Sequence, residues 1–222
     1  MKIAIDGPVG AGKSTIADAV ANALNILHLD TGAMYRAVGL SCLKAGIDYE
    51  DEAAVTALCE KLEMDVRHEA DGQHTLVNGE DLTGGLRTEA VSAAASRVAT
   101  YAGVRRAMVA AQQALAAKTD MLLDGRDIGT RVLPDADVKI YLTAAAGERA
   151  RRRWLEYQKK GQDVPFEEVL RDLEARDRQD MNREVDPLRQ AEDAVVVDTT
   201  ELDFDGSVAA VLAVIREATG RG

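Results

Sequence analysis

Residues 2–24 read KIAIDGPVGAGKSTIADAVANAL, and this stretch decides the fold. It opens with a short apolar run that ends in an acid, which is typical of a buried strand. Gly7 to Ser14 then match G-x-x-x-x-G-K-[ST], and a helical pattern begins near Lys13. Glycines allow such a loop to turn its N–H groups inward, and the helix adds the positive end of its dipole. The stretch therefore predicts a strand, a phosphate-binding loop and a helix.

The remaining chain alternates short apolar runs with longer helical patterns, which is typical of βαβ units around a parallel sheet. Strands are predicted at residues 2–6, 27–30, 121–124, 138–142 and 195–198. Helices are predicted at residues 13–24, 33–45, 51–63, 88–100, 104–118, 147–160, 165–182 and 206–218. Because Asp6, Asp30 and Asp124 each end a strand, we expect them around one crevice, at the sheet edge where open α/β sheets bind ligands.

Residues 45–96 follow a different pattern, with short alternating pieces separated by turn residues. The dipeptides Asp71-Gly72 and Asn78-Gly79 favour tight turns, so we expect a small antiparallel hairpin or meander. We interpret the region as a subdomain inserted into a single α/β domain. An alanine-rich stretch at residues 90–99 indicates a close-packed helix.

Composition narrows the class of protein. A chain of 222 residues suits one core with a subdomain, and 4% aromatic residues argue against a β-sandwich or barrel. The net charge of −11 repels nucleic-acid backbones and anionic lipid, so we expect neither as a partner. Cys42 and Cys59 are predicted to be reduced, packed thiols, and the scattered histidines do not suggest zinc. Without a signal-peptide pattern or an apolar span, the chain is predicted to be cytoplasmic.

The glycine-rich loop predicts nucleotide chemistry with defined roles for two residues. Lys13 would reach the β- and γ-phosphates of ATP, and the Ser14 hydroxyl would ligate Mg²⁺. The loop alone does not separate kinases from GTPase switches, motor ATPases and transporters, but the chain has neither an NKxD nor an LSGGQ-like motif. Two hypotheses remain open for Asp124: it either orients waters on Mg²⁺ or caps a strand.

Two arginines follow predicted strands and are candidates to hold an acceptor. Arg36 ends the run from Asp30 through Thr31 and Tyr35, while Arg126 and Asp127 follow Asp124. Phosphoryl transfer needs positive groups at loops beside the reacting phosphates. The alternative is a solvated helix face for Arg36 and a local ion pair for Arg126 with Asp127.

A third group of arginines indicates a lid at about residues 151–189. Two arginine-rich helical patterns flank the polar residues 161–165, and lid arginines would close over ATP and stabilise the transferring phosphoryl. Arg149 and Arg153 are predicted to bind ATP, and Arg178 is predicted to be catalytic. The alternative is a charged hairpin with pairs such as Glu174–Arg178. The core would then be residues 1–44, 97–150 and 190–222, with the insert at about 45–96.

Several segments, in order along nearly the whole chain, resemble the bacterial cytidylate kinases, a family of P-loop nucleoside monophosphate kinases. They are IAIDGPVGAGKST, LDTGAMYRAV, DGRDIGT, PDADVKIYLTA, ERARRR, RDRQDMNREVDPL and AEDAVVVDTT. The resemblance implies a three-layer α/β/α fold with five parallel strands, a lid and an enlarged monophosphate-binding insert. Asn25 departs from a common glycine, but asparagine also tolerates the left-handed conformation of a helix end.

The resemblance also implies roles for individual residues. The loop residues Gly7, Pro8, Val9, Gly10, Ala11, Gly12, Lys13, Ser14 and Thr15 would bind ATP. Arg36 and Arg126 would hold the CMP phosphate, with Tyr35 also in the acceptor site. Ser96, Arg105 and Asp127 would face cytosine, while Thr31, Arg176, Asp180 and Arg183 would surround the pentose and phosphates.

The resemblance therefore implies an enzyme that phosphorylates CMP and dCMP to CDP and dCDP with ATP and Mg²⁺, by in-line transfer, within pyrimidine nucleotide metabolism. Lys13, Arg126, Asp127 and Arg178 would be its catalytic residues, and we expect it to be a monomer. The alternatives are another small-acceptor kinase, acting on UMP, AMP or shikimate, and a nucleotide-dependent switch without acceptor chemistry.

Overall fold

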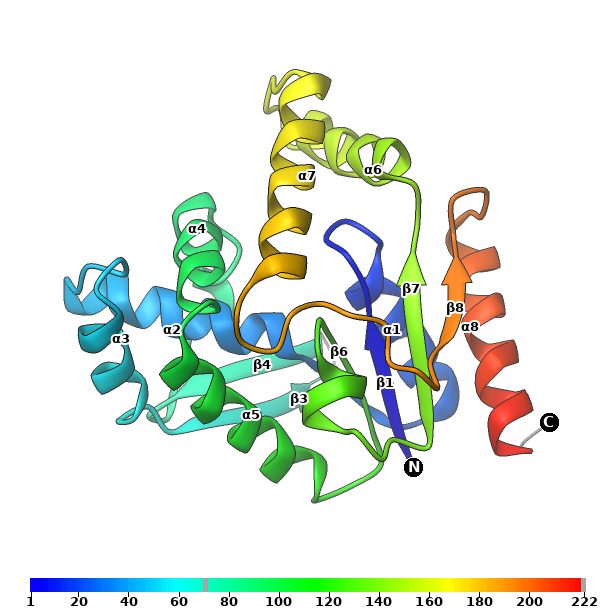
Figure 1. The fold of residues 1–222 in the computed structure, drawn as a ribbon, viewed down its shortest axis with the longest axis horizontal. Helices are drawn as coiled ribbons and strands as arrows, with labels where there is room; N and C mark the ends of the chain where they lie inside the picture. Colours follow the sequence, from blue (N-terminus) through cyan, green and yellow to red (C-terminus); the bar gives the residue numbers. More distant parts are fainter. Residues whose placement is uncertain (70–71, 221–222) are drawn as a thin grey trace. The chain divides into compact units, whose positions relative to one another are not determined.

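A computed structural model describes residues 1–69 and 72–220 of the chain. It contains two compact units, shown in Figure 1. The first unit comprises Met1–Ile26 and Asp120–Gly222, and the second comprises Leu27–Thr119. The predicted division into core, insert and lid stays a prediction.

The main sheet has five strands in the order β2-β6-β1-β7-β8. The pairs β1–β6, β1–β7 and β7–β8 are parallel, as expected for βαβ connections. All five predicted strands are present, so the predicted α/β fold is confirmed. The bounds are β1 Lys2–Asp6, β2 Leu27–Asp30, β6 Met121–Gly125, β7 Val138–Thr143 and β8 Val195–Asp198.

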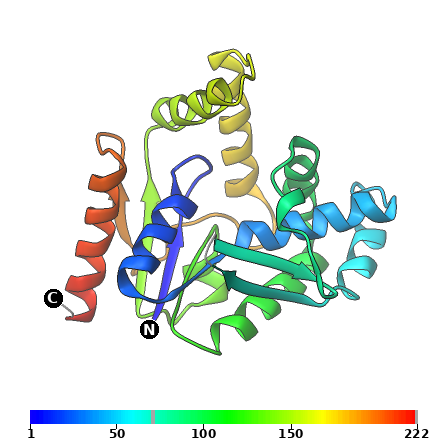
Figure 2. The ribbon, with the colours of Figure 1, turned by 180° about the vertical axis from the view of Figure 1, so that it is seen from behind.

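Two helices of the first unit, α1 (Lys13–Leu24) and α8 (Phe204–Thr219), lie on the same face of this sheet (Figure 2). Their buried stripes face the strands because apolar residues recur every three or four positions. This core includes Ile5, Val20, Leu122, Ile140, Leu142, Val211 and Ile215. Burying this surface anchors β1 and α1, the two elements that flank the glycine-rich loop.

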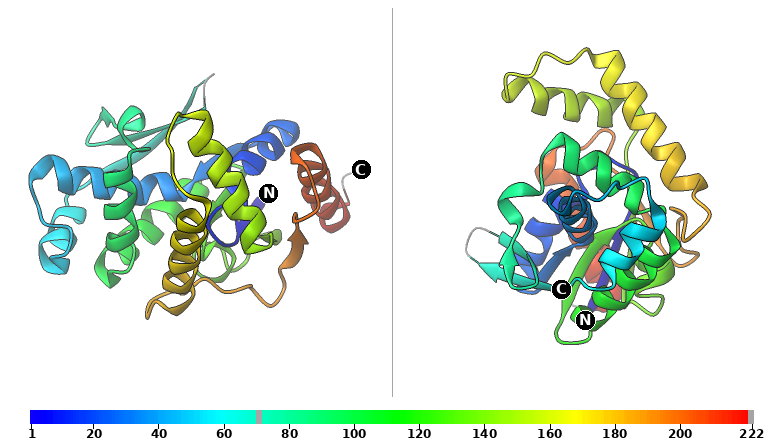
Figure 3. Two further views of the ribbon diagram at one scale, coloured as in Figure 1. Left: turned by 90° about the horizontal axis from the view of Figure 1, so that it is seen from above. Right: turned by 90° about the vertical axis from the view of Figure 1, so that its left-hand side faces the viewer.

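An arginine-rich helical hairpin follows β7. It consists of α6 (Ala146–Lys159) and α7 (Phe166–Asn182). Figure 1 shows α6 following the carboxyl end of β7, and Figure 3 shows the two helices, yellow-green and yellow, joined by a loop. Its apolar core is formed by Ala150, Val169 and Leu173, with Trp154, Tyr157 and Phe166 packed around them. The hairpin therefore has a small core of its own.

The second unit combines four helices with a three-stranded antiparallel sheet in the order β3-β4-β5. The predicted meander is thus confirmed, although Asp71 of its first predicted turn lies outside the described residues. The helices are α2 Thr31–Ala45, α3 Glu52–Cys59, α4 Glu89–Val98 and α5 Ala102–Ala116. The strands are β3 Met64–Glu69, β4 Gly72–Val77 and β5 Glu80–Asp81, followed by a 3₁₀ turn at Thr83–Gly85.

Small residues bring α2 and α4 into close contact. A Cβ on Gly39 would lie 2.9 Å from the backbone nitrogen of Ala95 and 3.1 Å from the Cβ of Ala94. The alanine-rich stretch is therefore the close-packed helix that was predicted. Cys42 and Cys59 are both buried free thiols, also as predicted.

The largest differences between the predicted and the observed elements lie at two places, and most other bounds agree within two residues. Helix α3 ends at Cys59, not at residue 63, because the chain turns there and then enters β3. A π-helical turn at Ile128–Val132 was not predicted. Asn25 caps α1 in the left-handed conformation, with φ 52°, as expected. Within the described part of the chain, no helix combines the length and hydropathy of a membrane span.

Candidate active site

The glycine-rich loop joins β1 to α1 through backbone conformations that favour glycine. Gly7, Gly10 and Gly12 have φ of 154°, 74° and 83°. A Cβ on Gly7 would lie 2.0 Å from the carbonyl oxygen of Leu142 on β7, so no side chain fits there. Helix α1 begins after Gly12 with no side-chain cap and no acid in its first turn. Its first N–H groups and its positive dipole end therefore suit an anion.

Lys13 is buried beside this loop, with only 6% of its surface exposed. Its Nζ donates to the carbonyl oxygen of Pro8 at 2.7 Å. Burial and, after it, the positive charge of Arg126 lower the pKa of Lys13 to about 7. The free protein therefore holds an ammonium group under electrostatic strain that a bound phosphate would relieve.

Ser14 and Asp124 bring a hydroxyl and a carboxylate together near the start of α1. The Ser14 Oγ donates to Asp124 Oδ2 at 2.9 Å, and Asp124 is buried opposite Ile5 in the β1–β6 pairing. A hydroxyl and a carboxylate at one point are a donor set that suits Mg²⁺, which takes oxygen ligands and retains several waters. The contact between Ser14 and Asp124 therefore fits the hypothesis that Asp124 orients metal-bound water.

Asp6, at the end of β1, holds the segment that follows Arg126 and Asp127. Its two carboxylate oxygens accept hydrogen bonds from the N–H groups of Ile128 at 2.8 Å and Gly129 at 2.7 Å. Burial raises the pKa of Asp6 to about 6, although the two backbone N–H groups oppose this shift. Asp6 is thus a positioning residue of the Arg126–Asp127 segment.

The raised pKa of Asp6 predicts a pH-dependent stability difference between the protein and its Asp6→Asn variant. Between the unfolded pKa of 3.8 and the native pKa of about 6, the native carboxyl keeps a proton that the unfolded carboxyl releases. Its stabilising contribution is full below the unfolded pKa and is lost as pH rises through 6. We expect the protein to lose about 2–3 kcal/mol of unfolding free energy relative to the variant across this range.

Urea unfolding of both proteins at pH 4 and pH 7 measures this change. Asparagine can accept only one of the two backbone hydrogen bonds. The free-energy cost of losing the other is the same at both pH values, so it drops out when the stability differences at the two pH values are compared. A stability difference that is the same at both pH values would contradict the prediction.

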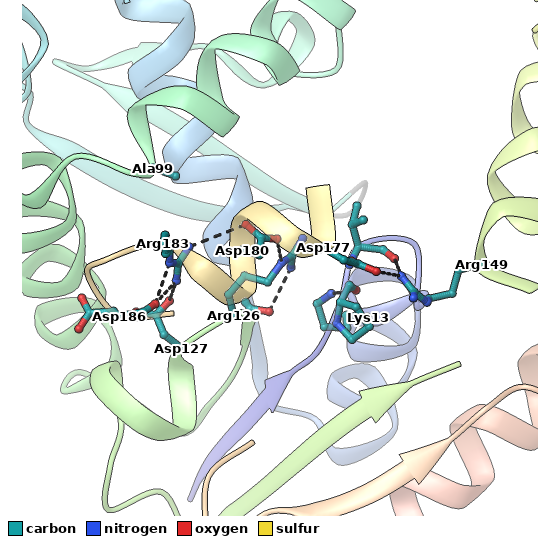
Figure 4. Close-up of polar contacts among 12 residues, drawn as sticks. Lys13, Ala99, Arg126, Asp127, Arg149, Asp177, Asp180, Arg183 and Asp186 are labelled. Atoms are coloured by element: carbon teal, nitrogen blue, oxygen red, sulfur yellow. Dashed lines mark hydrogen bonds and ion pairs between the residues drawn. The ribbon is translucent and has the colours of Figure 1, made fainter. Parts of the chain in front are cut away.

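Arg126 pairs with an acid on the hairpin helix α7, as Figure 4 shows. Its Nε donates to Asp180 Oδ2 at 2.7 Å, and its Nη1 donates to the carbonyl oxygen of Gly125 at 3.1 Å. Burial alone would raise the pKa of Asp180, but Arg126, Arg176 and Arg183 hold it below its usual value. Arg126 therefore keeps its charge at the carboxyl end of β6, held in place by one carboxylate.

Arg183 and Asp127 form a second buried pair next to the first. Arg183 Nη2 lies 3.4 Å from Asp127 Oδ1, and Arg183 Nη1 lies 4.0 Å from Asp180 Oδ1. The Arg183 Nε also donates to the carbonyl oxygen of Asp186 at 2.8 Å. The structure thus brings four predicted site residues together, namely Arg126, Asp127, Asp180 and Arg183.

Arg149 has partners that the sequence did not predict. Its Nη1 donates to Asp177 Oδ2 at 2.7 Å and to the carbonyl oxygen of Val9 at 2.9 Å. Asp177 Oδ1 in turn accepts from the Val9 N–H at 3.2 Å. Asp177 was missed, although its spacing of three from Asp180 on an arginine-rich helix was a readable signal.

Two other predicted lid arginines lie on exposed faces. The side chain of Arg178 is 65% exposed, and its Nη1 lies 4.0 Å from Glu174 Oε2. This is the ion pair that was given above as the alternative interpretation of Arg178. Arg153 donates to Glu156 at 3.1 Å and stacks over the ring of Tyr157. Their roles toward ATP stay predictions.

In the second unit, the predicted acceptor residues lie on α2, α4 and α5. Asp30 caps α2 through the Ala33 N–H and accepts from Arg36 Nη2 at 2.6 Å. The Arg36 Nε is buried and has no hydrogen-bond partner in the described part of the chain. This leaves a guanidinium edge suited to an anionic oxygen. Asp30 is thereby engaged within its own unit.

Arg105 and Tyr35 form a second pair in this unit. The Arg105 guanidinium lies over the Tyr35 ring, 5.6 Å from its centroid, and Arg105 Nη1 donates to the carbonyl oxygen of Ala99 at 3.2 Å. Both Arg105 and Thr31, the first residue of α2, are buried, while Ser96 on α4 is half-buried.

Comparison with known proteins identifies relatives over almost the whole chain. A family model described as cytidylate kinase matches residues 3–217. A cytidylate kinase of Bacillus velezensis is 47% identical over 217 residues, which cover 98% of this chain and 97% of that protein. A cytidylate kinase of Carboxydothermus hydrogenoformans is 47% identical over 215 residues, covering 97% of each chain.

A solved structure supports the fold alone. A gluconokinase from Sinorhizobium meliloti aligns with a TM-score of 0.51 at 15% identity, covering 99% of this chain and 94% of that one. The overall fold is therefore shared with that gluconokinase.

Proposed function

This chain belongs to the cytidylate kinase family, and on that premise we propose that it transfers the γ-phosphoryl group of ATP to CMP and dCMP, forming CDP and dCDP. One observation of the structure supports this reaction independently of the family membership. Lys13 of the glycine-rich loop and Arg126 beyond β6 are close enough for the charge of Arg126 to lower the pKa of Lys13. Two cations held together at the end of a sheet favour a ligand with several negative charges.

On the donor side, we propose that residues 7–15 hold the phosphates of ATP. The N–H groups at the start of α1 would bind the β-phosphate, and Lys13 would leave the Pro8 carbonyl to contact the β- and γ-phosphates. A phosphate partner raises the pKa of Lys13, so the side chain is charged when the nucleotide is bound.

The Ser14–Asp124 pair supports Mg²⁺ as the metal of the reaction. Ser14 would ligate the ion and Asp124 would orient its waters. Bound there, Mg²⁺ would supply positive charge that stabilises the phosphates during transfer.

On the acceptor side, we propose that Arg126 and Arg36 hold the phosphate of CMP. A phosphate oxygen of CMP attacks the γ-phosphorus of ATP, the bond to the β–γ bridging oxygen breaks, and ADP leaves. The attacking oxygen is already ionised near pH 7, so the protein needs to position it and not to deprotonate it. Asp127, held by Arg183, would orient the acceptor.

For the nucleoside, we propose the division of roles that the family resemblance implies. Ser96, Arg105 and Asp127 would contact cytosine, with Tyr35 beside them, and Thr31, Arg176, Asp180 and Arg183 would contact the pentose and phosphates. The N4 amine of cytosine can donate a hydrogen bond to a carboxylate, whereas uracil has a carbonyl acceptor at that position. The lid arginines Arg149, Arg153 and Arg178 would act on the donor, and closure would exclude water.

An ADP-release assay across acceptors tests the proposed function. We expect turnover with CMP and dCMP and much weaker turnover with UMP, AMP, GMP or shikimate. Turnover confined to one of the other acceptors would instead support a different small-molecule kinase. Nucleotide hydrolysis with no acceptor dependence would support a switch and would contradict the proposal. The monomeric state and the cytoplasmic location stay predictions.

A further inference from the structure

Asp177 and Arg149 bind the backbone of Val9 in the glycine-rich loop, through the two peptide groups on either side of its Cα. The Val9 N–H donates to Asp177 Oδ1, the Val9 carbonyl accepts from Arg149 Nη1, and the same Nη1 donates to Asp177 Oδ2. The three hydrogen bonds form a closed ring around Val9, and Figure 4 shows the Asp177 and Arg149 side chains turned toward each other. Arg149 is 6% exposed and Asp177 is 8% exposed, so these two side chains are largely shielded from water.

Apolar contacts join the loop to the hairpin at the same place. The side chain of Val9 packs against the core of α6 and α7 that contains Leu173. A Cβ on Gly10 would lie 3.1 Å from Leu173 Cδ1 and 3.4 Å from Arg149 Cβ. The base of the hairpin and the middle of the loop therefore form one packed structure.

The Nε of Arg149 is also engaged. Its Nε donates to the carbonyl oxygen of Ala144 at 2.8 Å, where β7 passes into α6. The guanidinium thus links the end of β7, the loop and α7 in a fixed geometry. In this arrangement Arg149 acts on the loop backbone, and its charge is neutralised by Asp177.

We propose that Asp177, through Arg149 and Val9, is a positioning residue for the donor phosphates: it sets the conformation of the glycine-rich loop from helix α7. The inference rests on the proposed use of ATP. It also links the two sides of the reaction, because α7 carries Asp180, the partner of Arg126, one turn beyond Asp177. Loop and acceptor residues are therefore held by one face of a single helix.

When the charge of Asp177 is removed, the positioning role predicts a change in ATP affinity opposite in sign to the change that electrostatics alone predicts. Removing a negative charge near bound ATP should strengthen binding if charge alone matters, and it should free Arg149 to contact a phosphate. If Asp177 positions the loop, removing its charge instead weakens binding, because the two peptide groups that flank Val9 lose their fixed orientation. Small displacements of binding groups cost up to about 100-fold in function.

The test is calorimetric titration of a non-hydrolysable ATP analogue with Mg²⁺ into the protein, Asp177→Asn, Asp177→Ala and Asp172→Asn. Asp172 is exposed on the same helix, so its variant matches the charge change without the contact. We expect about 10-fold weaker binding for Asp177→Asn and up to about 100-fold for Asp177→Ala, with Asp172→Asn unchanged. The KM for ATP should rise in parallel, while the KM for CMP stays within twofold.

Analogue affinity equal to or tighter than that of the unmodified protein in Asp177→Asn would overturn the inference. So would a loss confined to kcat or to the KM for CMP. If Asp177→Ala does not fold, Asp177→Asn decides, since it keeps the volume and one oxygen for the Val9 N–H. Hydrogen exchange at the Val9 amide of the unmodified protein adds a check without any substitution, and fast exchange there would also overturn the inference.

The analogue titration contains no acceptor, so it separates this inference from the proposed function. Failure of CMP turnover would leave the role of Asp177 measurable. Normal CMP turnover with unchanged analogue affinity in Asp177→Asn would overturn only the positioning role.

Discussion

Replacing Lys13 by methionine is expected to stop phosphoryl transfer and, at the same time, to raise the melting temperature of the free protein. Loss of a cation at the transferring phosphoryl should lower kcat by at least about 10³-fold. The stability gain follows from burial, because the native protein holds an ammonium group whose pKa is lowered to about 7. Methionine fills a similar volume and carries no charge to desolvate.

The pH dependence of this gain has a defined sign. Between the native pKa of about 7 and the unfolded pKa of 10.5, the unfolded chain binds a proton that the native protein does not. The stability of the protein therefore rises with pH across this range relative to Lys13→Met. The advantage of the variant is largest below pH 7 and disappears toward the unfolded pKa.

Thermal unfolding at pH 6.5 and pH 9.5, with turnover assays, measures both effects. Each kcal/mol of stabilisation corresponds to about 2–4 °C in a chain of this size. Lys139→Met is the matched control, since Lys139 is also buried but pairs with the exposed Asp193 at 2.9 Å. It should keep full turnover without a rise in melting temperature. A lower melting temperature for Lys13→Met than for the unmodified protein at pH 6.5 would contradict the argument.

Replacing Arg126 by alanine is expected to lower kcat by about 10³-fold and to raise the KM for CMP, while the affinity for ATP changes little. Arg126 is held by two hydrogen bonds that leave one edge of its guanidinium for an acceptor. Lysine should not restore activity, because a single ammonium cannot bond Asp180, the Gly125 carbonyl and a phosphate in a planar arrangement.

Two pKa values, which a spectroscopic titration can follow, should change when Arg126 is removed. The pKa of Asp180 should rise, since Arg126 is its leading stabilising charge, and the pKa of Lys13 should rise, since Arg126 lowers it. Arg131→Ala is the control on the same segment; its side chain is exposed and lies 3.6 Å from Asp186. Normal KM for CMP and normal kcat in Arg126→Ala would rule out its role at the acceptor.

Local patterns predicted the elements of this fold well. The strand from Lys2 to Asp6 and the helix from Lys13 to Leu24 have the predicted bounds, because hydrophobic period and glycine placement act over a few residues. The Asn25 cap and the three-stranded meander were predicted for the same reason. The π-helical turn at Ile128–Val132 was not, because it depends on the Asp6 carboxylate, 122 positions away from Ile128.

The arginine-rich helices show the limit of local reasoning. Their sequence predicts a charged hairpin, but every arginine has the same local pattern. In the structure Arg149 and Arg183 are buried in ion pairs, while Arg178 is exposed. Which arginine meets which acid depends on how the helices rotate against the sheet.

By itself, the sequence determined the α/β class, the glycine-rich loop and its lysine, and the family, since these depend on residue types at fixed short spacing. Only the tertiary structure decided that Asp177 holds Val9 across 168 positions and that Asp180 holds Arg126 across 54. The physical reason is that a buried charge must find its partner in space, and the chain folds such partners together without marking them in the local sequence.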